Sequence, residues 1–176
     1  MLLSKTDRLV TRGATRMKSW RLRLAGAIVA CAIGAVAWQF AWATAPVGFT
    51  IANIVGPVVL DEINTKSEID DRIQIKSKGF SDVYISNITI APGGHGGWHS
   101  HPGPSIITIK SGVASFYDDC DNPIVRRQYA AGTGFVEDAG CVHLLANEGD
   151  VPLEVVVVQL VPFGEPRRID EPAPAP

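Results

Sequence analysis

Residues 91–104 read APGGHGGWHSHPGP, a glycine- and proline-rich run that contains three of the four histidines in the chain. Two of them, His99 and His101, are separated by Ser100. Side chains at positions i and i+2 of a strand point to the same side, so both imidazoles can be directed at one point while Ser100 faces away. This geometry suits a metal ion, because neutral imidazole is a common metal ligand.

A second turn-rich stretch, residues 132–147, reads GTGFVEDAGCVHLLAN and supplies the fourth histidine, His143. His143 lies between turn residues and a short apolar strand, so that three imidazoles can converge. His95 lies four residues before His99 in a loop of glycines. We expect it to lie at the entrance of the site, or behind the ligands, rather than to be a ligand itself.

These two stretches resemble the two motifs of the cupin superfamily, G-x5-H-x-H-x3-4-E-x6-G and G-x5-P-x-G-x2-H-x3-N. The matching positions are Gly93, His99, His101 and Gly112 in the first motif, and Gly132, Gly140, His143 and Asn147 in the second. Two positions depart from the pattern: the motif glutamate falls at Ser105 or Ile106, and the motif proline is Asp138. The phrase GWHSHPGP followed by IITIKSGVASFYD is similar to small, exported, single-domain bacterial cupins, a group whose reactions are largely uncharacterised.

The resemblance implies an all-β fold, the antiparallel cupin β-barrel known as a double-stranded β-helix or jelly roll. It also implies that His99, His101 and His143 bind a divalent metal, with Fe, Zn, Mn, Ni and Cu all left open. The carboxylate ligand of the common cupin site is missing at Ser105. We expect Glu137 and Asp138, the nearest carboxylates in sequence, to be exposed.

The pattern of the chain after residue 45 agrees with this fold, since short apolar runs alternate with turn residues and no nucleotide-binding or helical heptad motif appears. Strands are predicted at 49–55, 58–60, 72–76, 83–90, 106–110, 113–117, 124–129, 134–136, 142–145 and 153–161. Glycine at Gly112 predicts a hairpin between the strands 106–110 and 113–117. The last strand is apolar nearly throughout and should lie inside. We therefore assign 46–162 to the barrel and 163–176 to a proline-rich tail that either crosses the barrel or hangs free.

Residues 1–45 have the pattern of an export signal or a membrane anchor. A basic segment up to residue 23 precedes the apolar run 24–43, and small-x-small cleavage sites follow. About 20 apolar residues also suffice to span a bilayer, so that an uncleaved leader would anchor the protein through residues 24–43. Either alternative predicts a periplasmic or extracellular domain. In that oxidising setting we expect Cys120 and Cys141 to form a disulfide.

Charge narrows the choice of partners. The leader holds 7 of the 16 Lys and Arg residues and 1 of the 18 Asp and Glu residues, which leaves residues 46–176 with 9 basic and 17 acidic side chains, a net charge of −8. A surface of that sign repels phosphate, so a nucleic-acid partner is not expected. The expected partner is a small molecule, and a homodimer is compatible with the prediction.

Two function classes follow from the site. Three neutral histidines would leave the charge of the metal uncompensated, which favours an anionic ligand bound directly to it. The first hypothesis is a metal-dependent enzyme, similar to the iron dioxygenases, that acts on a small anionic molecule. The alternative is a non-catalytic extracytoplasmic module that binds a small ligand or a metal. No catalytic residue is assigned from the sequence.

Overall fold

The computed structural model describes residues 43–70, 72–120 and 123–175. The predicted leader, 1–45, lies almost wholly outside them. Among the described residues no helix is long and apolar enough to cross a membrane. The strands are β1 (Val47–Leu60), β2 (Asn64–Lys66), β3 (Gln74–Lys76), β4 (Ser81–His95), β5 (His99–Ser100), β6 (Ser105–Ser111), β7 (Val113–Asp118), β8 (Val125–Ala130), β9 (Gly134–Glu137), β10 (His143–Ala146), β11 (Leu153–Pro162) and β12 (Ile169–Asp170).

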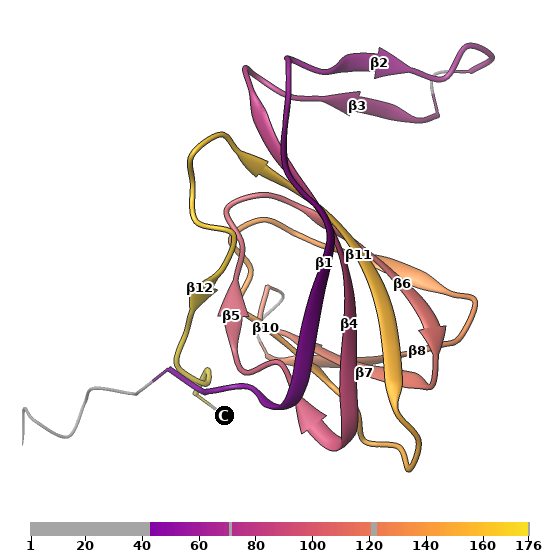
Figure 1. Cartoon of the computed structure of the whole chain (residues 1–176), viewed down its shortest axis with the longest axis vertical. Helices are drawn as coiled ribbons and strands as arrows, with labels where there is room; N and C mark the ends of the chain where they lie inside the picture. Colours follow the sequence, from indigo (N-terminus) through magenta and orange to yellow (C-terminus); the bar gives the residue numbers. More distant parts are fainter. Residues whose placement is uncertain (1–42, 71, 121–122, 176) are drawn as a thin grey trace, which may run out of the picture. The chain divides into compact units, whose positions relative to one another are not determined.

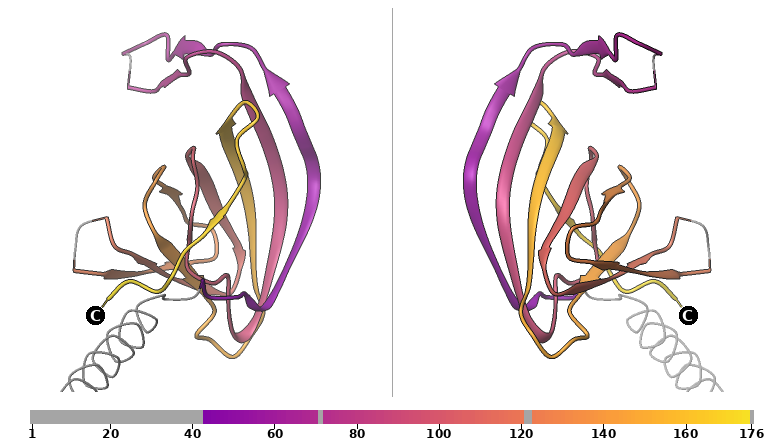
Figure 2. Two further views of the ribbon diagram at one scale, coloured as in Figure 1. Left: turned by 90° about the vertical axis from the view of Figure 1, so that its left-hand side faces the viewer. Right: turned by 90° about the vertical axis from the view of Figure 1, so that its right-hand side faces the viewer.

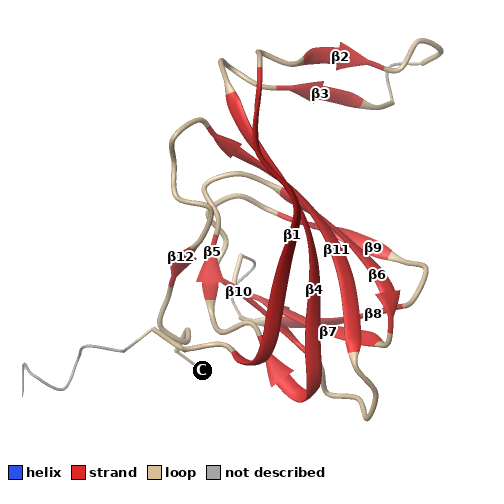
Figure 3. Ribbon diagram, viewed as in Figure 1, coloured by secondary structure: helices blue, strands red, loops and turns tan. Residues whose placement is uncertain are grey.

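The barrel is all-β and antiparallel, as expected, and consists of a long sheet that faces a group of shorter strands (Figure 1). In the long sheet β4 lies between β1 and β11, while β6 lies between β11 and β9. The shorter strands are β5, β7, β8 and β10. Figure 2 shows the long sheet from its edge, with the shorter strands on its concave side. The β2–β3 hairpin lies apart from the barrel at the far end of β1 (Figure 3).

The hydrophobic core fills the space between the two groups of strands. Along β11 burial alternates, so that Leu153, Val155 and Val157 are buried while the residues between them are half-exposed. Burial of one such aliphatic side chain contributes about 1.5–3 kcal/mol. Buried side chains from β4, β6, β7 and β10 pack against them; these are Ile88, Ile90, Ile107, Ile109, Ala114, Phe116 and Leu145. The predicted interior strand is therefore confirmed as a central strand with one buried face.

The predicted hairpin between 106–110 and 113–117 is wrong, although both strands exist. Each edge of β6 is already paired, one with β11 and the other with β9. No edge of β6 is left for β7, which pairs with β10 and β8 in the opposite group of strands. Gly112, at φ 79°, is the corner at which the chain passes from one group to the other. A turn glycine marks a change of direction, and it is tertiary pairing that decides where the next strand goes.

The proline-rich segment after β11 lies against the barrel and does not hang free, which agrees with the first of the two alternatives predicted for this tail. Its short strand β12 pairs with β5, so that Asp170 is opposite His99 and Ile169 is opposite Ser100. Farther along, the Ser100 hydroxyl donates a hydrogen bond to the Glu171 carboxylate over 3.0 Å. This part of the chain is therefore a wall of the histidine site.

Candidate metal centre

His99, His101 and His143 come together at one point inside the barrel. Their possible ligand atoms all lie within 4.8 Å of one another, and all three side chains are buried. The pairing of β5 with β10 places His99 directly opposite His143, and His101 follows β5 on the same side as His99. His95, at the end of β4, is not part of the group; its Nδ1 accepts a hydrogen bond from the Gly97 N–H.

Each of the three rings uses Nδ1 to bind a backbone carbonyl. His99 binds the Gly97 carbonyl at 2.7 Å, His101 binds that of Arg167 at 2.8 Å, and His143 binds that of Cys141 at 2.9 Å. A carbonyl only accepts, so Nδ1 carries the proton and Nε2 of the neutral ring keeps a free lone pair. Three Nε2 lone pairs are thereby presented to the same region.

The ring of His101 has a second polar neighbour, the Gln159 side-chain amide, whose nitrogen lies 3.2 Å from Nδ1. Both groups are donors once Nδ1 carries its proton, so this contact is not a hydrogen bond. The Gln159 amide instead donates to the Ser105 hydroxyl over 3.1 Å. The tautomer of His101 is thus set by the Arg167 carbonyl.

Burial keeps His99 and His143 neutral. It lowers the pKa of His99 to about 2, and the neighbouring His143, Arg168 and His101 add to this effect. Burial also lowers the pKa of His143, partly opposed by the Glu137 carboxylate. Neutral imidazole is the form that binds metals. The His143 Nε2 atom is buried and has no hydrogen-bond partner among the described residues. An unpaired buried acceptor is costly, and a metal ion would satisfy it.

The expectation that Glu137 is exposed is wrong, whereas Asp138 is exposed as expected. Glu137 ends β9 with only 4% of its surface accessible. One carboxylate oxygen lies 3.4 Å from His101 Nε2, and the other lies 3.6 Å from His143 Nε2. Burial by itself raises the pKa of this carboxyl group, but its interactions with His101 and His143 bring the pKa below its usual value.

Glu137 lies directly opposite Ser105 in the pairing of β9 with β6. Ser105 is a position where the cupin motif has its glutamate, so the neighbouring strand supplies a carboxylate next to the place where the motif lacks one. The sequence contains a signal for this: Glu137 is two residues after Phe135, which packs against the core, and both therefore point inward. The pairing of β9 with β6 is not visible in the sequence.

A cavity of about 290 Å³ adjoins the histidines. Its apolar walls are Pro46, Phe49, Ile51, Ile88, Ile107, Leu145 and Val157. Its polar side chains are His99, His101, Glu137, Gln159, Arg167 and Arg168. The two arginines could not be predicted as cavity residues, because they belong to the proline-rich tail, which β12 holds against the distant strand β5.

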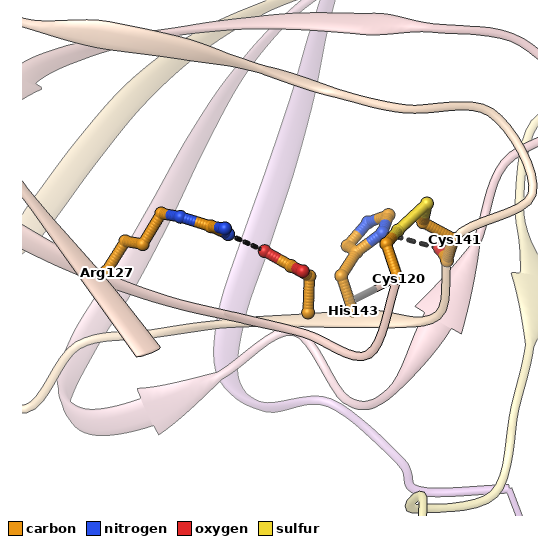
Figure 4. The surroundings of a disulfide bond; sticks show 5 residues. Cys120, Arg127, Cys141 and His143 are labelled. Carbon is orange, nitrogen blue, oxygen red and sulfur yellow. Dashed lines mark hydrogen bonds and ion pairs between the residues drawn. A yellow bond between two sulfur atoms is a disulfide. The ribbon is translucent and has the colours of Figure 1, made fainter. Parts of the chain in front are cut away.

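The predicted disulfide between Cys120 and Cys141 is present, with 5.4 Å between the two Cα atoms (Figure 4). It joins the loop after β7 to the turn before β10. The same figure shows the Cys141 carbonyl accepting the hydrogen bond from His143, and Arg127 paired with the carboxylate of Asp118. The bridge thus holds the peptide group that orients one of the three imidazoles.

Comparison with known proteins supports what the fold indicates. Residues 86–159 match the family model described as "Cupin domain". The chain contains a cupin domain. His99, His101 and His143 all lie inside the matched segment. Arg167 and Arg168 lie outside it. None of the curated proteins compared with the chain matches it.

The chain is also similar to several solved structures. The polyketide cyclase RemF from Streptomyces resistomycificus is 11% identical with a TM-score of 0.50, over 73% of this chain and 74% of that chain. A conserved protein with a double-stranded β-helix domain from Klebsiella pneumoniae is 20% identical with a TM-score of 0.46, over 72% of this chain and 85% of that chain. An oxalate oxidase is 26% identical with a TM-score of 0.41, over 46% of each chain, so that the match spans about half of that protein. The likeness to RemF concerns the fold.

Proposed function

We propose that this cupin binds a divalent metal ion through the Nε2 atoms of His99, His101 and His143. The observation that carries the proposal is the arrangement of the rings: each Nδ1 is occupied by a backbone carbonyl, and the buried Nε2 of His143 has no partner among the described residues. Histidine nitrogens with a neighbouring carboxylate suit iron, zinc, manganese, nickel or copper. The residues therefore fit the metal that the cupin motifs imply.

The proposed activity is that of a metal-dependent, dioxygenase-like enzyme that acts on a small anionic molecule. Iron bound here would supply Lewis acidity and electron transfer to dioxygen. The side chains of the protein supply the other requirements of the reaction. The apolar cavity walls exclude water from the substrate, and Arg167 makes the cavity attractive to an anion. The Glu137 carboxylate can hold a proton taken from the substrate at the side of the histidines.

Glu137 changes the reason for expecting an anionic substrate. A carboxylate close to His101 and His143 offsets part of the charge of a bound metal, so that charge alone no longer selects an anion. The preference now rests on Arg167, which lines the cavity and contacts only neutral acceptors. Glu137 is also the buried candidate for a general base that the motifs did not reveal, which favours catalysis over the alternative of a binding module.

The test uses purified protein reconstituted with ferrous iron without oxygen, followed by oxygen uptake over a panel of small thiols, diketones and hydroxy acids. At least one compound should raise uptake above that of the His143→Ala variant. The Glu137→Gln variant should lose uptake if the carboxylate holds the proton. If no compound raises uptake and none changes the spectrum of the iron, the non-catalytic binding module replaces the enzyme.

We also propose that residues 46–176 act outside the cytoplasmic membrane. The basic segment followed by an apolar run supports export, and the disulfide between Cys120 and Cys141 is typical of an oxidising compartment. A fusion of residues 1–50 to a reporter that is active only after export should give a signal, and an inactive fusion would contradict the proposal. The homodimer stays a prediction.

A further inference from the structure

The guanidinium group of Arg167 is an uncompensated charge beside the cavity. It binds three neutral acceptors: Nε donates to the Gln159 amide oxygen, Nη1 to the Asn53 amide oxygen at 2.7 Å, and Nη2 to the Ser86 hydroxyl at 2.8 Å. The ring of Tyr84 lies 4.9 Å from its central carbon. No carboxylate of residues 43–70, 72–120 and 123–175 forms an ion pair with it, since those ion pairs involve other side chains.

The neighbouring Arg168 differs in this respect. Its Nε forms an ion pair with Asp170, and its Nη2 donates to the Gly96 carbonyl at 2.8 Å. Both arginines line the same cavity and come from the same segment. Arg168 is therefore paired with a carboxylate of its own segment, whereas Arg167 has no carboxylate partner among the described residues.

The contacts of Arg167 described above do not use all of its N–H donors. A guanidinium group has five N–H bonds, of which the three contacts above use one on each nitrogen. One N–H therefore remains on Nη1 and one on Nη2. Each of these N–H groups can donate to a carboxylate oxygen, and such charge-assisted bonds are among the strong hydrogen bonds of proteins. The three acceptors hold the group in place before the ligand arrives, which reduces the entropy lost on binding.

The same residue touches the histidine site through its backbone. The Arg167 carbonyl binds Nδ1 of His101, and its side-chain partner Gln159 lies beside that same ring. A molecule in the cavity can therefore contact the histidine site at one end and the guanidinium group at the other. The side chain and the carbonyl have separate tasks, so a substitution at position 167 removes the first and leaves the second.

We propose that Arg167 is the residue that recognises the substrate, which carries a carboxylate group at the end away from the metal. The inference rests on the proposed function, because it takes the histidines as the site of the metal. It goes further by naming a chemical group of the substrate and the side chain that selects it. It also explains why the proline-rich segment is held against β5: that pairing brings the guanidinium group to the cavity.

The experiment measures binding of malonate and acetate, and of their neutral amides malonamide and acetamide, to the full chain loaded with zinc, by isothermal titration calorimetry. Arg167→Met keeps the backbone carbonyl and an unbranched apolar stem but removes the charge and the donors. Arg168→Met is the matched control, since it removes a cation of the same cavity that is already paired. Zinc content of every variant is measured separately.

Wild-type protein should bind malonate more tightly than malonamide. Arg167→Met should weaken malonate binding by about tenfold or more, which is the effect expected on loss of a charged hydrogen-bond pair. Arg168→Met should change it by less than about threefold, and neither substitution should change the zinc content. Arg167→Lys, which keeps the charge but not the paired donors, should fall between Arg167→Met and wild type.

Equal malonate affinity in wild type and Arg167→Met, with zinc retained in both, would overturn the inference. So would loss of zinc in Arg167→Met, since Arg167 would then serve the structure of the metal site. Wild-type protein that takes up no zinc would instead contradict the proposed function. The role of Arg167 would then be decided by the same comparison of variants on the metal-free protein.

Discussion

The disulfide between Cys120 and Cys141 gives a prediction whose magnitude follows from the chain. Its two cysteines are 21 residues apart, and closing a loop of that length lowers the entropy of the unfolded chain. In the chain-entropy model this stabilises the folded protein by about 3 kcal/mol at 25 °C. Replacing both cysteines with serine removes the constraint and leaves no single thiol at either position. The free energy of unfolding should therefore fall by about 3 kcal/mol.

The assay is urea denaturation of the wild-type protein and the double variant at neutral pH, followed by circular dichroism. The slope of the free energy against urea should rise in the variant, because an unfolded chain without the bridge exposes more surface. Wild-type protein under reducing conditions is the matched control and should behave like the variant. A change in stability below about 0.5 kcal/mol, or reduced wild type that keeps its full stability, would refute the reasoning.

Two further predictions concern stability. Replacing the buried Asn147 with alanine removes the donors to the Ile90 and Val151 carbonyls, and urea denaturation should show a loss of about 2 kcal/mol or more; an unchanged midpoint would contradict this structural role. Metal-free protein should lose stability as the pH falls below about 6.5. His99 then binds a proton in the unfolded chain but stays unprotonated in the folded protein, where its pKa is about 2. Denaturation in a chelating buffer between pH 7.5 and 5 measures this slope, which His99→Gln should reduce; a slope that is the same in both proteins would contradict the assignment.

Much of the barrel and the three histidines could be predicted from the sequence because their signals are local. Apolar runs between turns mark strands, and the spacing of His99 and His101 places two rings on one side of a strand. The disulfide could be predicted because export and cysteine count suggest it. The hairpin at Gly112 was wrong because a glycine specifies a turn but not the partner of the following strand.

Glu137 and Arg167 were missed for a related reason. Each reaches the site through pairing between strands distant in sequence, β9 with β6 and β12 with β5. The segment around Arg167 contains prolines and few apolar residues, features typical of a loose tail. Its position depends on contacts of Gly164, Arg167 and Glu171 with other parts of the barrel, and no local sequence pattern predicts these contacts.

The central claim is that His99, His101 and His143 bind a metal, and metal content of purified protein tests it most directly. Elemental analysis of the wild-type protein after loading and desalting should give about one equivalent of divalent metal per chain. The His101→Ala variant should retain a circular dichroism spectrum typical of a folded barrel and hold almost none. The His95→Ala variant, which removes a histidine of the same glycine-rich stretch outside the group, should keep the full equivalent. Undiminished metal in His101→Ala would contradict the account.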